Sequence, residues 1–155
     1  MENQTLKAVA GALIAEVGKI LDDYLVVDDQ LFSWKNTFGW NDVAPLKDKV
    51  QPLSDRLIQL LEKTKAEQRQ ILELSENNPE KLLLVEFYQL FTNYTDTLKM
   101  AVQNMGRVLV HIDTRRNNKI EFKQARYESD LIIYKAQVDK YQLFGEKLNA
   151  LLKRF

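Results

Sequence analysis

The chain has 155 residues, and its 22 basic and 22 acidic side chains give a formal net charge of zero. Balanced charge argues against a general nucleic-acid binder, which carries a basic excess, and the absence of cysteine excludes disulfides, thiolate catalysis and zinc–thiolate sites. No run of about 18 apolar residues occurs, and no basic signal-peptide start is present, so neither a constitutive transmembrane helix nor secretion is expected. These features fit one cytoplasmic domain over residues 1–155.

A first helix is predicted from Thr5, as its cap, to about Tyr24 or Leu25. Its apolar residues recur at the spacing of one helical face: Leu6, Val9, Leu13, Val17, Ile20 and Tyr24. The opposite face carries small residues where surface helices usually carry charges: Ala8, Gly11, Ala12, Ala15 and Gly18. Each glycine inside a helix costs about 1 kcal/mol relative to alanine, so something should offset that cost. Two interpretations are open: a central bundle helix buried nearly all round, or a helix that can leave its bundle and enter a membrane.

An aromatic connector is expected over residues 26–43, where Phe32, Trp34, Phe38 and Trp40 are separated by turn-forming Asn and Gly. Two tryptophans carry too much apolar area for a solvated linker. We therefore expect Trp34 or Trp40 to be mostly buried against the bundle.

A second helix is predicted with Asp42 as its cap and Pro45 in its first turn. Pro52 marks either a kink or the true start of this helix, which should end near Leu74 or Ser75. Its apolar residues include Leu53, Leu57, Leu60 and Leu61, again at helical spacing.

A third helix should start with Asn78 as its cap and Pro79 at its first position, and it either continues past Gly106 or bends there. A fourth helix follows a polar turn and carries apolar residues from Tyr127 to Leu152. Four long amphipathic helices with short connections predict an all-α fold. The architecture expected is an antiparallel four-helix bundle with an N-terminal helix rich in small residues.

Catalytic patterns are missing from the sequence. His111 is the only histidine, and a single histidine in an apolar stretch is more often a hydrogen-bonded packing residue than a ligand or base. No nucleophile elbow and no phosphate-binding loop occurs. We therefore predict no enzyme, no catalytic residue, no cofactor and no metal site.

Several segments carry a family resemblance. The small-residue run from Val9 to Leu13 lies close to the start of the chain, and a connector containing Trp34 follows it. The leucine-rich second helix runs into the charged stretch at residues 62–67, and the basic-aromatic segment at residues 122–127 precedes a final helix closing in residues 144–152. This arrangement resembles the HeLo-type cell-death domain of fungi and its relatives. Those relatives are the four-helix domain of mixed-lineage kinase domain-like pseudokinases, the plant powdery-mildew-resistance-type coiled-coil domain and bacterial analogues.

The resemblance implies the N-terminal effector domain of a longer cell-death or innate-immunity signalling protein. Such domains are activated by an attached or partner module, form homo-oligomers, move from the cytoplasm to a membrane and permeabilise it with the first helix. The membrane-active positions would be Leu6, Val9, Gly11, Leu13, Ile14, Val17, Gly18, Ile20 and Leu21. Oligomerisation would be required, because Glu16 and Lys19 cost about 2.5–3.5 kcal/mol each in hydrocarbon unless they line a water-filled pore.

Basic residues around the start of the fourth helix are the candidates for contact with anionic lipid, at roughly 1 kcal/mol for each cation near the surface. They are Arg115, Arg116, Lys119, Lys123 and Arg126. Ordinary solubility is the competing interpretation of this group.

A second class of function also fits the sequence. The chain could be a helical protein–protein interaction module, such as an adaptor or a toxin-neutralising partner, without membrane activity. The neutral charge and a possible aromatic binding patch at Trp34, Phe38 and Trp40 favour this alternative.

Overall fold

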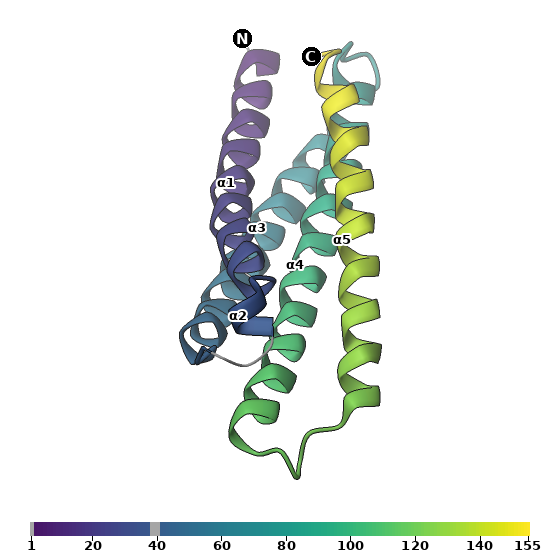
Figure 1. Cartoon of the computed structure of the whole chain (residues 1–155). Helices are drawn as coiled ribbons and strands as arrows, with labels where there is room; N and C mark the ends of the chain where they lie inside the picture. The colour runs from purple at the N-terminus through teal and green to yellow at the C-terminus, as the bar shows by residue number, and fades with distance from the viewer. Residues whose placement is uncertain (1, 38–40) are drawn as a thin grey trace.

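The computed structural model describes residues 2–37 and 41–155, excluding the side chains of residues 2, 3, 34 and 37. Its elements are α1 (Glu2–Leu31), α2 (Trp34–Thr37), α3 (Ala44–Leu72), α4 (Lys81–Asn117) and α5 (Gln124–Leu152). The four long helices run alternately up and down, and both chain ends lie at the same end of the bundle (Figure 1). No strand occurs within the described ranges, so the predicted all-α four-helix bundle is confirmed.

The first helix is longer than predicted. It ends at Leu31 rather than near Tyr24 or Leu25. Val27 and Leu31 extend the apolar stripe by two further turns, and both are buried. Their packing against the core stabilises the helix over residues that the sequence had assigned to a connector. The predicted burial of Trp34 or Trp40 concerns parts of the chain that lie outside the described residues and side chains.

The starts of α3 and α4 differ from the predicted caps. Helix α3 begins at Ala44, so Pro52 lies inside it and does not mark its start. Asp42 does not occupy the capping position, but its carboxylate accepts a hydrogen bond from the Ala44 backbone N–H at 3.0 Å. Asn78 similarly accepts from the Glu80 backbone N–H at 2.9 Å, and α4 begins only at residue 81.

The predicted end of the second helix is also corrected, since α3 stops at Leu72. Helix α4 is the central element of the bundle: it packs against both α3 and α5 and runs without interruption through Gly106. A Cβ atom at Gly106 would lie 2.9 Å from Cγ1 of Val50, so this glycine permits the close approach of α3 and α4.

Gly106 therefore differs in its surroundings from Gly11 and Gly18, which would have no atom within 4 Å of an added Cβ. We expect Gly11→Ala and Gly18→Ala each to raise the free energy of unfolding by about 1 kcal/mol, because alanine is the better helix former. Gly106→Ala should not raise the free energy of unfolding, because overpacking against the stiff Val50 side chain costs about 1–3 kcal/mol. Urea unfolding of the three variants measures this, and a stabilised Gly106→Ala would contradict the packing.

Candidate functional site

The candidate site is α1, whose two faces have opposite surroundings. The inner face packs in the core: Leu13, Val17 and Ile20 are buried. Leu6, Val9, Ile14 and Leu21 are partly buried against the same core. The predicted packing of the first helix through its apolar stripe is therefore confirmed.

The outer face of α1 is the row of small residues. Ala8, Gly11, Ala12 and Ala15 are exposed, and Gly18 is half-buried. The interpretation of a helix buried nearly all round is thus wrong, because the bundle covers only the apolar side. Nothing within the chain approaches Gly11 or Gly18, so the cost of two helical glycines is not offset by any close helix contact in the described structure.

Ion pairs tie the flanks of α1 to the rest of the bundle. The Glu16 carboxylate lies 3.2 Å from Nζ of Lys63 on α3. Further along, Asp23 lies 2.7 Å from the Arg56 guanidinium. Of the two pore-lining candidates, Glu16 is therefore engaged with α3, whereas Lys19 is exposed on the outer side of α1.

Buried tyrosines link α1 to α5. The hydroxyl groups of Tyr24 and Tyr134 are hydrogen-bonded to each other, and the Tyr134 hydroxyl also donates to the Asp28 carboxylate. Desolvation by burial raises the pKa of Tyr24 and of Tyr134 far above the ordinary tyrosine value. This network was not predicted from the sequence, although Tyr24 and Asp28 lie one helical turn apart and could have indicated a polar contact on the core side.

The basic candidates lie at the other end of the molecule from the small-residue part of α1. They surround the connection between α4 and α5, whereas residues 6–18 are near the chain termini (Figure 1). The Arg115 guanidinium lies over the rings of Phe122 and Tyr127, at 5.6 and 5.4 Å from their centroids. Lys119, Lys123, Arg116 and Arg126 are exposed. The structure therefore does not bring the lipid-facing candidates and the first part of α1 into one surface.

His111 makes the hydrogen bond expected of a packing residue, with Nε2 at 2.7 Å from the Asp130 carboxylate on α5. In the described part of the chain, no group of three or more His, Asp or Glu side chains is placed to hold a metal ion. None of the helices described here contains a segment of the length and apolar character needed to cross a membrane.

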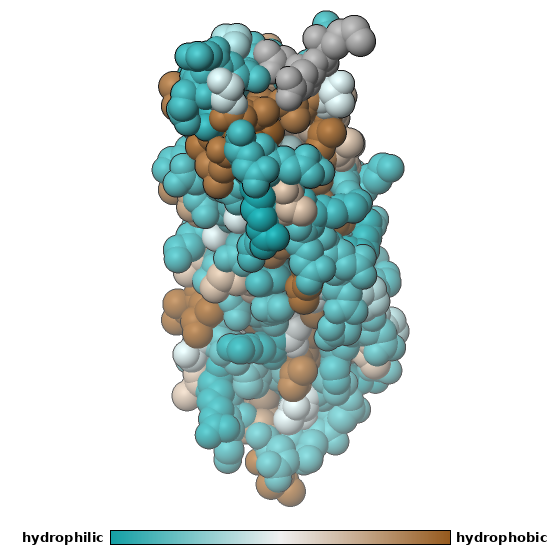
Figure 2. Space-filling view, turned by 180° about the vertical axis from the view of Figure 1, so that it is seen from behind, coloured by the Kyte–Doolittle hydropathy of each residue, from teal (hydrophilic) through white to brown (hydrophobic). Residues whose placement is uncertain are grey.

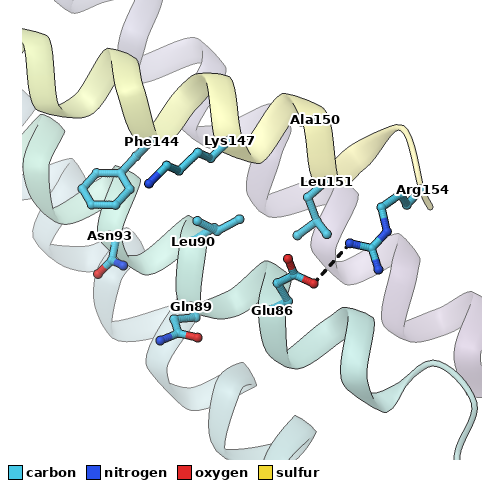
Figure 3. A pocket seen from close by; sticks show the side chains of 9 residues that line it. All are labelled: Glu86, Gln89, Leu90, Asn93, Phe144, Lys147, Ala150, Leu151 and Arg154. Atoms are coloured by element: carbon cyan, nitrogen blue, oxygen red, sulfur yellow. Dashed lines mark hydrogen bonds and ion pairs between the residues drawn. The ribbon is translucent and has the colours of Figure 1, made fainter.

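A cavity of about 570 Å³ lies between α4 and α5 near the C-terminus (Figure 3). Its apolar part is formed by Leu90 and Leu151, and Glu86 and Arg154 close one end as an ion pair at 3.4 Å. The Lys147 ammonium lies 5.8 Å from the centre of the Phe144 ring. These charges mostly contact each other or an aromatic face within the chain, so the cavity shows no set of groups aimed at one ligand.

Seen from behind, the molecule is mostly hydrophilic, with apolar residues in separate patches (Figure 2). Comparison with known proteins gives no match to any family model, any curated protein or any solved structure. The exposed small-residue face of α1 is therefore the feature of the molecule that points to a function.

Proposed function

We propose that this chain is a helix-association module, which forms homo-oligomers through the outer face of α1 while that helix stays in its bundle. The observation that carries the proposal is the pair of uncompensated glycines on the outer side of α1, of which Gly11 is exposed and Gly18 is half-buried. Small residues at three- and four-residue spacing allow two helix backbones to approach closely. A contact with a second helix would offset the glycine cost of about 1 kcal/mol each.

The test is the oligomeric state of the full chain, measured by sedimentation over a wide range of protein concentration. We expect concentration-dependent association that Gly11→Leu combined with Gly18→Leu weakens at least tenfold, because the leucines hold the backbones apart. A Cβ atom at either glycine would have no described atom within 4 Å, so the leucines enter open surroundings at their point of attachment. Ala136→Leu, at an exposed position of α5, is the matched control. A chain that is monomeric at every concentration contradicts the proposal.

Membrane permeabilisation by an oligomeric cell-death or immune effector is the second candidate, and the peripheral position of α1 favours it. Helix α1 packs mainly on α3, whereas α3, α4 and α5 are joined through the central α4. Release of α1 would leave that three-helix unit connected. The release would also expose six large side chains that are buried now: Leu13, Val17, Ile20, Tyr24, Val27 and Leu31.

At about 1.5–3 kcal/mol for each large side chain, that exposure costs on the order of 10 kcal/mol, comparable to the stability of a whole domain. An activating module and a membrane would have to supply this energy. Association through the outer face requires no release, and for this reason we place it first.

Cross-linking α1 to α3 separates the two candidates. The chain has no cysteine, so Glu16→Cys and Lys63→Cys, replacing an observed ion pair, can be joined by a short bismaleimide. Dye leakage from vesicles of phosphatidylserine and phosphatidylcholine is measured with the chain forced to oligomerise. If α1 inserts, the unlinked protein causes leakage and the linked protein does not. If the chain is an association module alone, neither form causes leakage, and both still associate.

A further inference from the structure

A groove runs between α1 and α5, on a different part of α1 from the small-residue face. Helix α1 packs mainly on α3 and helix α5 on α4. The two outer helices are joined by side-chain contacts of Tyr24 with Tyr134 and Tyr141 and not by close backbone packing. Two hollows of about 370 and 350 Å³ lie between them. The first lies beside Leu21, Leu25 and Gly145, and the second beside Phe32 and Val138. We call the two hollows together the α1–α5 groove.

The floor of the α1–α5 groove is fixed by aromatic contacts. The ring of Tyr141 meets those of Tyr24 and Tyr94 edge-on, with centroids 6.0 and 6.1 Å apart. The Tyr24–Tyr134 hydrogen bond joins the two helices beneath the groove. A Cβ at Gly145 would lie 3.0 Å from Tyr94, so the α5 backbone rests directly on that ring. The groove is therefore formed before anything binds in it.

Apolar side chains are left exposed along the α1 wall. Leu25, on α1, and Phe32, directly after its last residue, are each 42% exposed and lie seven residues apart. The Phe32 backbone N–H still donates to the Asp28 carbonyl, so Phe32 continues the side of the helix that carries Leu25. Phe32 stacks on Tyr134 with centroids 6.0 Å apart, so its position is set by the floor. The wall from Leu21 to Phe32 is about 16 Å long at 1.5 Å per residue, which matches three turns of a helix.

The charges of the α1–α5 groove are predominantly negative, and the Asp28 carboxylate among them accepts the Tyr134 hydrogen bond. Asp28, Asp139 and Glu146 line it, against a single cation, Lys135. Across the part of the chain that the structure describes, none of these three carboxylates takes part in an ion pair. In the α4–α5 cavity, by contrast, the Glu86 carboxylate is already paired with a cation of the chain.

We propose that the α1–α5 groove docks an amphipathic helix of a partner protein, with the partner's apolar side on Leu25 and Phe32 and its lysines or arginines on the α5 side. Asp139 and Glu146 lie seven residues apart, about 10 Å along α5, so they match cations spaced by two helical turns. This surface is additional to the α1 face proposed for self-association and does not depend on it.

The probe is a fluorescently labelled peptide of about five turns, with leucines along one helical side and two lysines seven residues apart. We expect the full chain to bind it at least tenfold more tightly than the same peptide with glutamates in place of the lysines, and binding should weaken with added salt. Asp139→Lys combined with Glu146→Lys should reverse the preference. Both positions are exposed, so circular dichroism should confirm an unchanged fold.

Leu25→Asp should weaken binding of both peptides, because it places a charge on the apolar wall. The matched control is Glu62→Lys combined with Glu121→Lys, which makes the same charge change at exposed positions away from the groove and should leave the preference intact. Equal binding of the two peptides, no binding, or no effect of the Asp139 and Glu146 substitutions would overturn the proposal. So would a wild-type dimer that excludes the peptide and dissociates on those substitutions, since the occupant would then be a second copy.

Discussion

The folded chain should unfold in alkali once the pH rises above about 10, because all six of its tyrosines are buried in the core and five of them have a raised pKa. Burial raises the pKa of Tyr88 and of Tyr94 to about 12. It also raises the pKa values of Tyr24, Tyr134 and Tyr141, where the nearby Asp28 carboxylate adds to the effect. In every case the phenolate is disfavoured in the folded state.

A tyrosine whose folded pKa exceeds its unfolded value contributes its full stability below the unfolded pKa. That contribution is lost as the pH rises toward the folded pKa, because only the unfolded chain releases the proton easily. Near pH 11 the burial of Tyr24, Tyr88, Tyr94 and Tyr134 should lower the free energy of unfolding by about 1.4 kcal/mol each, or roughly 6 kcal/mol together, and Tyr141 acts in the same direction. A loss of that size is comparable to the whole stability of a typical domain.

Tyrosinate absorbance and helical circular dichroism, followed together from neutral to high pH, measure this effect. The two signals should change in one cooperative step, since ionisation of the buried groups requires unfolding. Ionisation of all six tyrosines at ordinary pKa values while the helices remain intact would show that the tyrosines are not in the core.

Two glutamates on the inner face of α1 should detach that helix, whereas two on its outer face should not. Leu13→Glu combined with Val17→Glu puts unpaired carboxylates where the wild-type side chains are only 5% exposed. We expect a loss of about 3–5 kcal/mol or more in the free energy of unfolding. Ala12→Glu combined with Ala15→Glu introduces the same two carboxylates at exposed neighbouring positions. The free energy of unfolding of this variant should stay within roughly 1 kcal/mol of the wild-type value.

Hydrogen exchange separates local detachment from global unfolding in this experiment. In the inner-face variant the amides of α1 should lose protection before those of the central α4, because α1 packs mainly on a single neighbour. Equal losses of stability in the two variants would contradict the two-faced description of α1. The outer-face variant also tests association, since it introduces like charges into the proposed contact.

The sequence by itself determined the number of long helices, their apolar stripes and the absence of familiar catalytic patterns. These features depend on local spacing: Leu13, Val17 and Ile20 point to one side of any helix that contains them. For the same reason, the sequence already separated the apolar and small-residue sides of α1.

Only the tertiary structure decided what covers each side. Gly11, Gly18 and Gly106 are the same residue type within helices, yet the first two face open space and the third lies against Val50. The hydrogen bonds among Tyr24, Tyr134 and Asp28 join residues more than 100 positions apart in the sequence. The extension of α1 to Leu31 and the α1–α5 groove likewise depend on how the helices are arranged in the bundle. Helical periodicity determines on which side of its own helix a residue lies. Whether that side is buried depends on which other helix packs against it.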